Sequence, residues 1–116
     1  MNNFDFSAIV QNAKDVVIVT EASPIDAPGP KIVYVNDAFT ETTGYSAEEV
    51  IGKTPRIFQK EGTDKEELSK IREALEKKEP VRVTLRNFSK TGKEYWVDIS
   101  ILPLRNTEGK VTHFAS

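Results

Sequence analysis

The last third of the chain carries the strongest constraint on the fold, because its side chains alternate with a period of two. Between residues 81 and 87 apolar and polar side chains alternate, and the same alternation returns between residues 95 and 101. Successive side chains of a β-strand point to opposite faces, so each segment predicts a half-buried strand. Turn-forming segments at residues 89–93 and 106–109 separate these strands and lead into a third, at residues 111–115. The inward-facing side chains predicted for the first two strands are Val81, Val83, Leu85 and Asn87, and Tyr95, Val97, Ile99 and Ile101.

The first third predicts a short helix and two further strands. Residues 4–12 have spaced apolar side chains that favour a helix, and residues 16–20 are a β-branched, largely apolar run typical of a buried strand. Residues 22–30 contain three prolines and a glycine, which predict a loop. A second strand is expected at residues 31–35.

The middle third predicts interrupted helices. Ser46 and Glu49 have the spacing of a capping box, and Pro55 suits the first turn of another short helix that extends to residue 59. A second capping box, Thr63 with Glu66, is expected to open one longer helix that Pro80 ends. The fold class predicted for residues 1–116 is therefore α+β, a single domain with a five-stranded antiparallel sheet and helices over one face. The apolar face of the longer helix is formed by Leu68, Ile71, Ala74 and Leu75.

Composition excludes several classes of function. The chain has 116 residues with 16 basic and 18 acidic side chains, which argues against a nucleic-acid-binding surface. No apolar run approaches the roughly 20 residues of a membrane span, so a soluble, cytoplasmic domain is expected. There is no cysteine and only one histidine, His113, so neither a metal cluster nor a catalytic triad is expected. Nothing in the sequence predicts an enzyme.

Several segments together resemble the PAS family, and within it the flavin-binding LOV (light-oxygen-voltage) group. Residues 52–59, Gly-Lys-Thr-Pro-Arg-Ile-Phe-Gln, are similar to the LOV signature Gly-x-Asn-Cys-Arg-Phe-Leu-Gln. Residues 33–39 and 43–52 resemble the second strand and first helices of the family. The resemblance covers nearly the whole chain, including Leu-Arg-Asn-Phe at 85–88 and Tyr-Trp-Val at 95–97.

The resemblance implies a set of flavin-binding residues. Arg56 and Arg72 match the arginines that hold the flavin phosphate, a role suited to forked cationic donors. Gln59 and Asn87 match amides that hydrogen-bond the ribityl chain and the ring edge. The implied cofactor is a flavin nucleotide, with FMN favoured over FAD, and no cofactor is expected if side chains fill the pocket. The apolar positions that would enclose the ring are Ile99, Ile101 and Phe114.

Three positions depart from the LOV pattern. Pro55 occupies the place of the reactive cysteine, so no thiol can add to a flavin ring here. Thr54 replaces an asparagine by a shorter polar side chain, and Val97 replaces a second amide at the ring edge. A glutamine that switches hydrogen bonds in LOV signalling would follow Ser116 and lie outside these residues.

Each of these positions also has a simpler interpretation. The two arginines fit solvated surface positions, and Gln59 fits an exposed helix end. Asn87 fits an amide turned to the backbone of the following turn, and the isoleucines fit an ordinary filled core. Trp96 falls on the outer face of its strand, where it is available to a partner or to a terminal helix.

Two functions therefore remain open. One is a sensory module that binds a flavin nucleotide non-covalently and relays its redox or light state, without chemistry at a cysteine. The alternative is a cofactor-free PAS module that serves dimerisation and signal relay. Both imply an input domain taken from a larger signalling protein, a fused kinase or cyclase effector, and a homodimer formed through the sheet face or a terminal helix.

Overall fold

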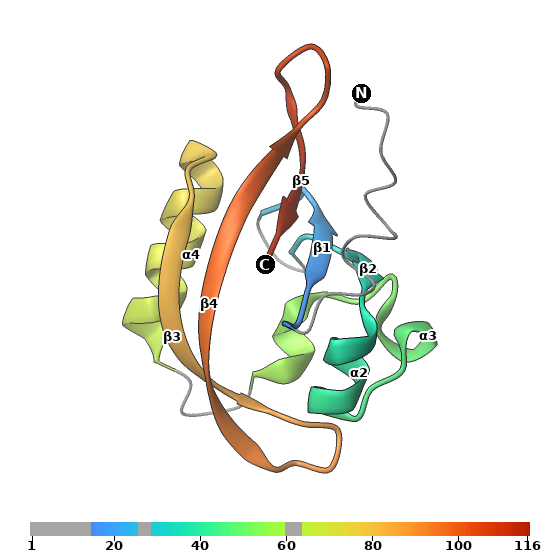
Figure 1. The fold of residues 1–116 in the computed structure, drawn as a ribbon. Coiled ribbons are helices and arrows are strands. Elements are labelled where there is room, and N and C mark those ends of the chain that lie inside the picture. Colours follow the sequence, from blue (N-terminus) through green and yellow to red (C-terminus); the bar gives the residue numbers. More distant parts are fainter. Residues whose placement is uncertain (1–14, 26–28, 60–63) are drawn as a thin grey trace.

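A computed structural model describes residues 15–25, 29–59 and 64–116. The helix predicted at residues 4–12 lies outside the described residues. Five strands form one antiparallel sheet, as predicted, and their order is β2-β1-β5-β4-β3 (Figure 1). The strands are β1 (Ile18–Glu21), β2 (Ile32–Val35), β3 (Val81–Phe88), β4 (Glu94–Arg105) and β5 (Val111–Ala115).

The long hairpin of β3 and β4 has the predicted alternation. Its ladder pairs Val81 with Ile101 and continues without a shift to Phe88 with Glu94. Val83, Leu85 and Asn87 are buried, whereas the intervening Arg82 and Thr84 are exposed. Register is strongly determined here, because a slip of one residue would move every apolar side chain to the solvent face.

The first strand begins two residues later than predicted. Asn36, at the end of β2, explains the difference, because its Oδ1 accepts a hydrogen bond from Val17 N at 3.0 Å. Asn36 Nδ2 also donates to Asp15 O at 2.8 Å. The backbone before Ile18 is thus held by Asn36, through its side chain and through its backbone N–H, which donates to Val17 O at 3.2 Å. The predicted strand is confirmed, but only from Ile18 onward.

Four helical segments connect the two halves of the sheet. The helix α2 (Asp37–Thr43) was not predicted from its residue pattern, although Asn36 caps it and Gly44 ends it with a φ of 81°. The helix α3 (Ala47–Val50) has the predicted capping box, with Glu49 N donating to Ser46 Oγ at 3.2 Å. The 3-10 helix η1 (Pro55–Phe58) begins at the predicted proline.

The longer helix α4 (Lys65–Lys77) differs from its prediction at both ends. The expected capping box of Thr63 with Glu66 was wrong, since Asp64 is the N-cap and its Oδ1 accepts from Glu66 N at 2.8 Å. An aspartate caps as well as a threonine, and it lies one residue nearer the helix. At the other end Lys78 adopts a left-handed conformation, so the helix stops before Pro80.

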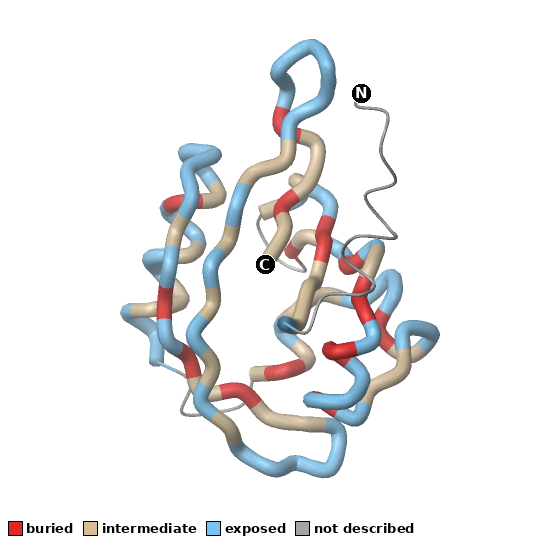
Figure 2. Tube along the Cα trace, viewed as in Figure 1, coloured by how far each residue is buried: buried red, intermediate tan, exposed pale blue. Residues whose placement is uncertain are grey.

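The close-packed core lies on one side of the molecule, between β2, α2, α3 and η1. Phe39 and Phe58 meet edge to face with ring centroids 5.5 Å apart, and Tyr45 packs on Phe58 at 5.7 Å. Figure 2 shows buried segments around α2 and β2 and also on β1, β3 and β5, whereas β4 alternates between intermediate and exposed along most of its length. The buried residues of this core are Ile32, Val35, Phe39, Val50 and Phe58.

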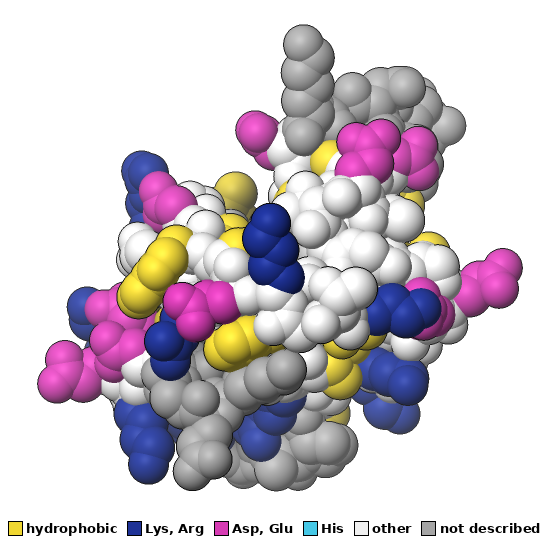
Figure 3. All heavy atoms as spheres, turned by 90° about the horizontal axis from the view of Figure 1, so that it is seen from below, with side chains coloured by type: hydrophobic (Ala, Val, Ile, Leu, Met, Phe, Trp, Pro, Cys, Tyr) yellow, Lys and Arg dark blue, Asp and Glu magenta, His cyan; other side chains and the backbone are white. Residues whose placement is uncertain are grey.

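The described surface is mixed in charge. On the face shown in Figure 3, acidic and basic side chains are interspersed, and short apolar stretches lie between them. No helix among the described residues is both long and apolar enough to cross a membrane.

Candidate functional site

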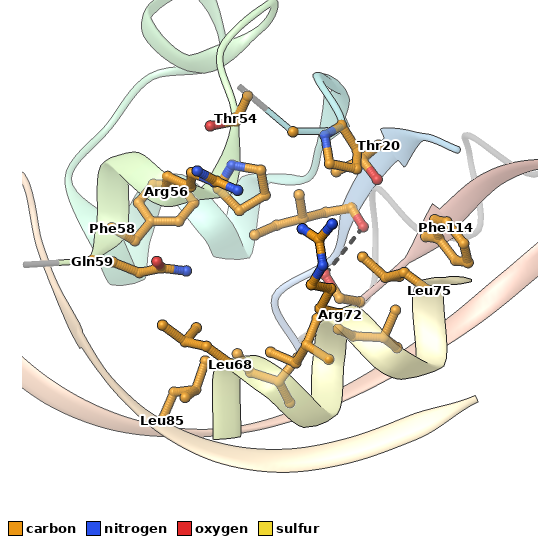
Figure 4. A pocket seen from close by; sticks show the side chains of 18 of the residues that line it. Thr20, Thr54, Arg56, Phe58, Gln59, Leu68, Arg72, Leu75, Leu85 and Phe114 are labelled. Atoms are coloured by element: carbon orange, nitrogen blue, oxygen red, sulfur yellow. Dashed lines mark hydrogen bonds between the residues drawn. The ribbon is translucent and has the colours of Figure 1, made fainter. Parts of the chain in front are cut away.

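A cavity of about 560 Å³ lies between α4, η1 and the inner face of the sheet (Figure 4). This volume falls within the range of about 300–1,000 Å³ that is usual for small-molecule and cofactor sites. The side chains of α4 that were predicted to fill a core, Leu68, Ile71 and Leu75, line this cavity and are only partly buried. The interpretation in which side chains fill this space therefore does not describe the structure.

Every site residue predicted from the sequence lines this one cavity. The residues come from five separate elements, so only the folded chain brings them together. They are Thr54, Arg56, Gln59, Arg72, Asn87, Ile99, Ile101 and Phe114.

Two arginines lie on one side of the cavity. Arg56 belongs to η1 and Arg72 to the middle of α4, and both guanidinium groups point into the space between these helices (Figure 4). Both residues are exposed, and Arg72 Nε also pairs with Glu76 Oε1 at 2.9 Å on the helix surface. Two forked cations at a solvent-facing mouth suit a phosphate group, which each can bind with two parallel hydrogen bonds.

The loop before β2 approaches the same side. Gly29 is buried with a φ of 99°, a conformation that side chains rarely adopt. A Cβ at this position would lie 3.6 Å from Arg56 Nε and 3.9 Å from Thr54 Cβ. Because contacts of this length are ordinary, the positive φ rather than the space beside η1 favours glycine here. The segment was predicted only as a loop, and its place in the cavity wall was not predicted.

Thr54 and Gln59 flank η1 at its two ends. Thr54 is the N-cap residue, but its side chain makes no capping hydrogen bond. Gln59 is the C-cap residue, and its backbone N–H donates to Arg56 O at 3.1 Å. Both side chains are partly buried in the cavity wall, so each offers a hydrogen-bonding group to a ligand.

Asn87 supplies an unused acceptor deeper in the cavity wall. Its side chain is buried, with 9% of its surface exposed, and Oδ1 has no hydrogen-bond partner among the described residues. The interpretation in which this amide turns back to the next turn is thereby not supported. An unpaired buried carbonyl costs free energy that a ligand N–H would recover. The cavity thus combines two arginines that suit an anionic group with an unpaired polar atom buried in its wall.

Apolar side chains form the remaining walls. Ile99 and Ile101 project from β4 opposite Val83 and Val81, and the buried Phe114 of β5 closes one side. Such walls suit a flat ring system, since apolar contact is non-directional and excludes water. Pro55, the first residue of η1, also lines the cavity.

Val97 does not contact this cavity. It lines a second cavity of about 440 Å³ on the other side of Asn87, together with Tyr95 and Phe39. The two cavities share Asn87 and Ile99 in their walls. Tyr95 was not among the predicted site residues. Its only sequence signal was its predicted place on the inward face of β4, two residues before Val97.

The sequence profile of the PAS domain family matches residues 15–116. The chain belongs to the PAS domain family. Among curated proteins, this PAS domain is similar to the blue-light-activated histidine kinases of Brucella anthropi and Brucella ovis. It is 34% and 33% identical to them, over 96% of this chain and 22% of theirs. The PAS domain thus spans about a fifth of the length of these relatives.

Solved structures extend the likeness to LOV domains. A structure from a study of a flavin analogue and the LOV domain mechanism superposes with a TM-score of 0.84 at 31% identity. It covers 97% of this PAS domain and 82% of that chain. An RNA-binding LOV receptor superposes with a TM-score of 0.83 at 35% identity, and the match covers 94% of this domain and 30% of that chain. The LOV domain of the blue-light-activated histidine kinase EL346 from Erythrobacter litoralis superposes with a TM-score of 0.78 at 29% identity. The match covers 86% of this PAS domain and 89% of that chain. This PAS domain is therefore LOV-like and belongs to a group of sensory domains.

Proposed function

We propose that this PAS domain binds a flavin nucleotide non-covalently and transmits the state of the flavin to an effector. The observation that carries the proposal is the convergence of the predicted residues on one cavity, with two arginines and an unpaired buried acceptor in its wall. The site chemistry fits a flavin mononucleotide, because the arginines suit its phosphate and the apolar walls suit its ring. When bound, the flavin would supply absorption of blue light and reversible reduction.

The residues of the chain have separate roles in this proposal. Arg56 and Arg72 bind the phosphate, and Gln59 and Thr54 orient the polar chain between phosphate and ring. Asn87 holds the polar edge of the ring, at the wall that the two cavities share. A change in hydrogen bonding at that edge acts directly on β3, and through the ladder on β4.

Chemistry at a cysteine is absent from the proposal. The chain contains no cysteine, and Pro55 has no group that can add to a flavin. Signalling must therefore arise from non-covalent changes at the ring, such as altered hydrogen bonding at Asn87.

The proposed output is a kinase, as in the relatives named blue-light-activated histidine kinases. Residues 1–116 would form one input module of a cytoplasmic signalling protein. A homodimer through the outer face of the sheet is part of the same proposal, because Trp96 and Leu102 are exposed there, at 67% and 52%. Light scattering of the protein and of Trp96→Ser tests this point, and an equal monomer mass for both would contradict it.

The experiment that tests the proposal is an absorption spectrum before and after incubation with excess FMN, followed by removal of free ligand. A retained, structured blue band is expected. A colourless protein after this treatment would overturn flavin binding and favour the cofactor-free module, whose self-association would then be measured.

A further inference from the structure

A row of exposed polar side chains follows one edge of α4 beside the cavity. Ser69 and Arg72 line the cavity, and Glu76 follows Arg72 by four residues. Residues three and four apart in a helix are neighbours on its surface, so these side chains succeed one another along the helix. All three are exposed, whereas the apolar residues of α4 that line the cavity are partly buried. The row therefore lies where the cavity meets solvent.

Glu76 holds one edge of the guanidinium group of Arg72. Arg72 Nε and Glu76 Oε1 are 2.9 Å apart, and the two side chains are 48% and 53% exposed. Figure 4 shows that the guanidinium group of Arg72 nevertheless points into the space between α4 and η1. Because this group is planar and rigid, a contact at Nε restricts the direction in which its far edge points.

The fold itself has little need of this ion pair. Exposed ion pairs contribute little to stability, because solvent screens them. Glu73 and Lys77 form a pair with the same spacing on the same helix, also at 2.9 Å, and neither residue lines the cavity. What distinguishes the pair of Arg72 with Glu76 is that its cation reaches the cavity.

Glu76 acts on a bound phosphate in two opposite directions. Its carboxylate repels the phosphate, but water and salt screen this repulsion at an exposed position. Its contact with Nε reduces the rotamer freedom that the Arg72 side chain loses when it binds a ligand, and such losses are large for arginine. This second effect does not depend on screening, so it prevails at physiological ionic strength.

We propose that Glu76 is a positioning residue that holds the guanidinium group of Arg72 toward the phosphate of a bound flavin nucleotide. The acceptor oxygen at Nε performs this role, rather than the charge of the carboxylate. Glu76 does not line the cavity, so it acts only through Arg72. The proposal rests on the proposed flavin function and adds to it a residue that organises the phosphate site.

The experiment compares the affinities of FMN and riboflavin at physiological ionic strength. Glu76→Ala removes the acceptor and should weaken FMN binding about threefold to tenfold, whereas riboflavin, which has no phosphate, should bind as before. Glu76→Gln keeps an acceptor for Nε and should bind FMN within about twofold of the unmodified protein. Glu73→Ala removes the same charge and one ion pair from the same helix, so it is the matched control and should change neither affinity.

A double variant distinguishes positioning of Arg72 from an effect elsewhere. In the Arg72→Ala background, Glu76→Ala should cause no further loss of FMN affinity, because the residue through which it acts is absent. A further loss in that background would contradict the proposal.

Other outcomes would also count against the positioning role. Glu76→Ala that binds FMN as tightly as the unmodified protein, or more tightly, would show that repulsion at least balances the contact with Nε. Equal losses for FMN and riboflavin would indicate a change in the whole cavity. Glu76→Gln that is as weak as Glu76→Ala would assign the effect to charge. In each case flavin binding itself would stand, whereas a protein that binds neither flavin overturns the proposed function and this inference with it.

Discussion

Lys90 Nζ forms an ion pair with Glu49 Oε2, which joins the turn of the β3–β4 hairpin to the capping box of α3. The backbone N–H of Lys90 also donates to Thr43 O at 2.9 Å, at the end of α2. The hairpin that carries Asn87 is therefore fastened to the helical side of the molecule at its turn.

This contact predicts a pH dependence of stability. The hydrogen bond from Lys90 lowers the pKa of Glu49, and the backbone N–H of Ser46 adds to the effect. A carboxyl whose pKa is lowered by folding stabilises the native state above its unfolded pKa, and this contribution is lost as pH falls. The melting temperature of the protein should therefore exceed that of Glu49→Gln at neutral pH, and the gap should close below the ordinary glutamate pKa of 4.5.

The difference in melting temperature between the protein and Glu49→Gln should be small and should decrease in high salt, because the ion pair of Lys90 with Glu49 is exposed. Glu48→Gln, the next residue of α3, is the matched control. A gap of equal size for both variants, or one that persists in acid, would contradict the assignment to Glu49.

Arg56→Ala and Arg72→Ala should each weaken FMN binding. Loss of a charge-assisted contact costs about 1.5–3 kcal/mol, which is about tenfold to 150-fold in the dissociation constant. Riboflavin, which lacks the phosphate, should bind each variant as it binds the unmodified protein. Titration of tryptophan or flavin fluorescence gives both affinities. Arg82→Ala is the control, since Arg82 pairs with Asp98 on the exposed face of the sheet. Equal losses for FMN and riboflavin would show that the arginines do not bind the phosphate.

Pro55→Cys should introduce reversible light chemistry. Pro55 is the first residue of η1 and lines the cavity, and a cysteine there requires no change of backbone conformation. After reconstitution with FMN, blue light should bleach the blue absorption band, and the band should return in the dark. Comparison with the double variant Arg56→Ala/Pro55→Cys distinguishes a low fraction of bound FMN from a wrong position of the flavin ring. A fully loaded Pro55→Cys protein that is stable under light would show that the ring is not beside η1.

Ile101→Trp should abolish flavin binding and retain the fold. Ile101 lines the cavity from β4, so a larger side chain occupies the space that a ring requires. Leu102→Trp places the same side chain on the opposite, exposed face of the strand and should bind FMN normally. Circular dichroism verifies folding of both variants, and FMN titration gives the affinities. Normal binding by a folded Ile101→Trp protein would place the flavin elsewhere.

Local sequence patterns determined most of the secondary structure. The alternation from Val81 to Asn87 predicted which side chains face inward, because a strand has a period of two. The capping box of Ser46 and the proline at position 55 predicted helix starts, because both act within one turn. The misplaced N-cap of α4 shows the limit of such signals, since Thr63 and Asp64 are chemically equivalent caps and only the observed backbone selects one.

Tertiary structure alone decided whether the inward-facing side chains fill a core or enclose a cavity. Ile71, Leu75 and Ile101 have the pattern of core residues, yet they line open space because α4 packs at the edge of the sheet on β3. A periodic pattern specifies the direction of a side chain, whereas a cavity depends on the separation between elements distant in sequence. The pairing of Asn87 with Tyr95 likewise exists only through the strand register. The sequence therefore determined the wall residues and the absence of a reactive thiol, and the packing of helix on sheet determined the site.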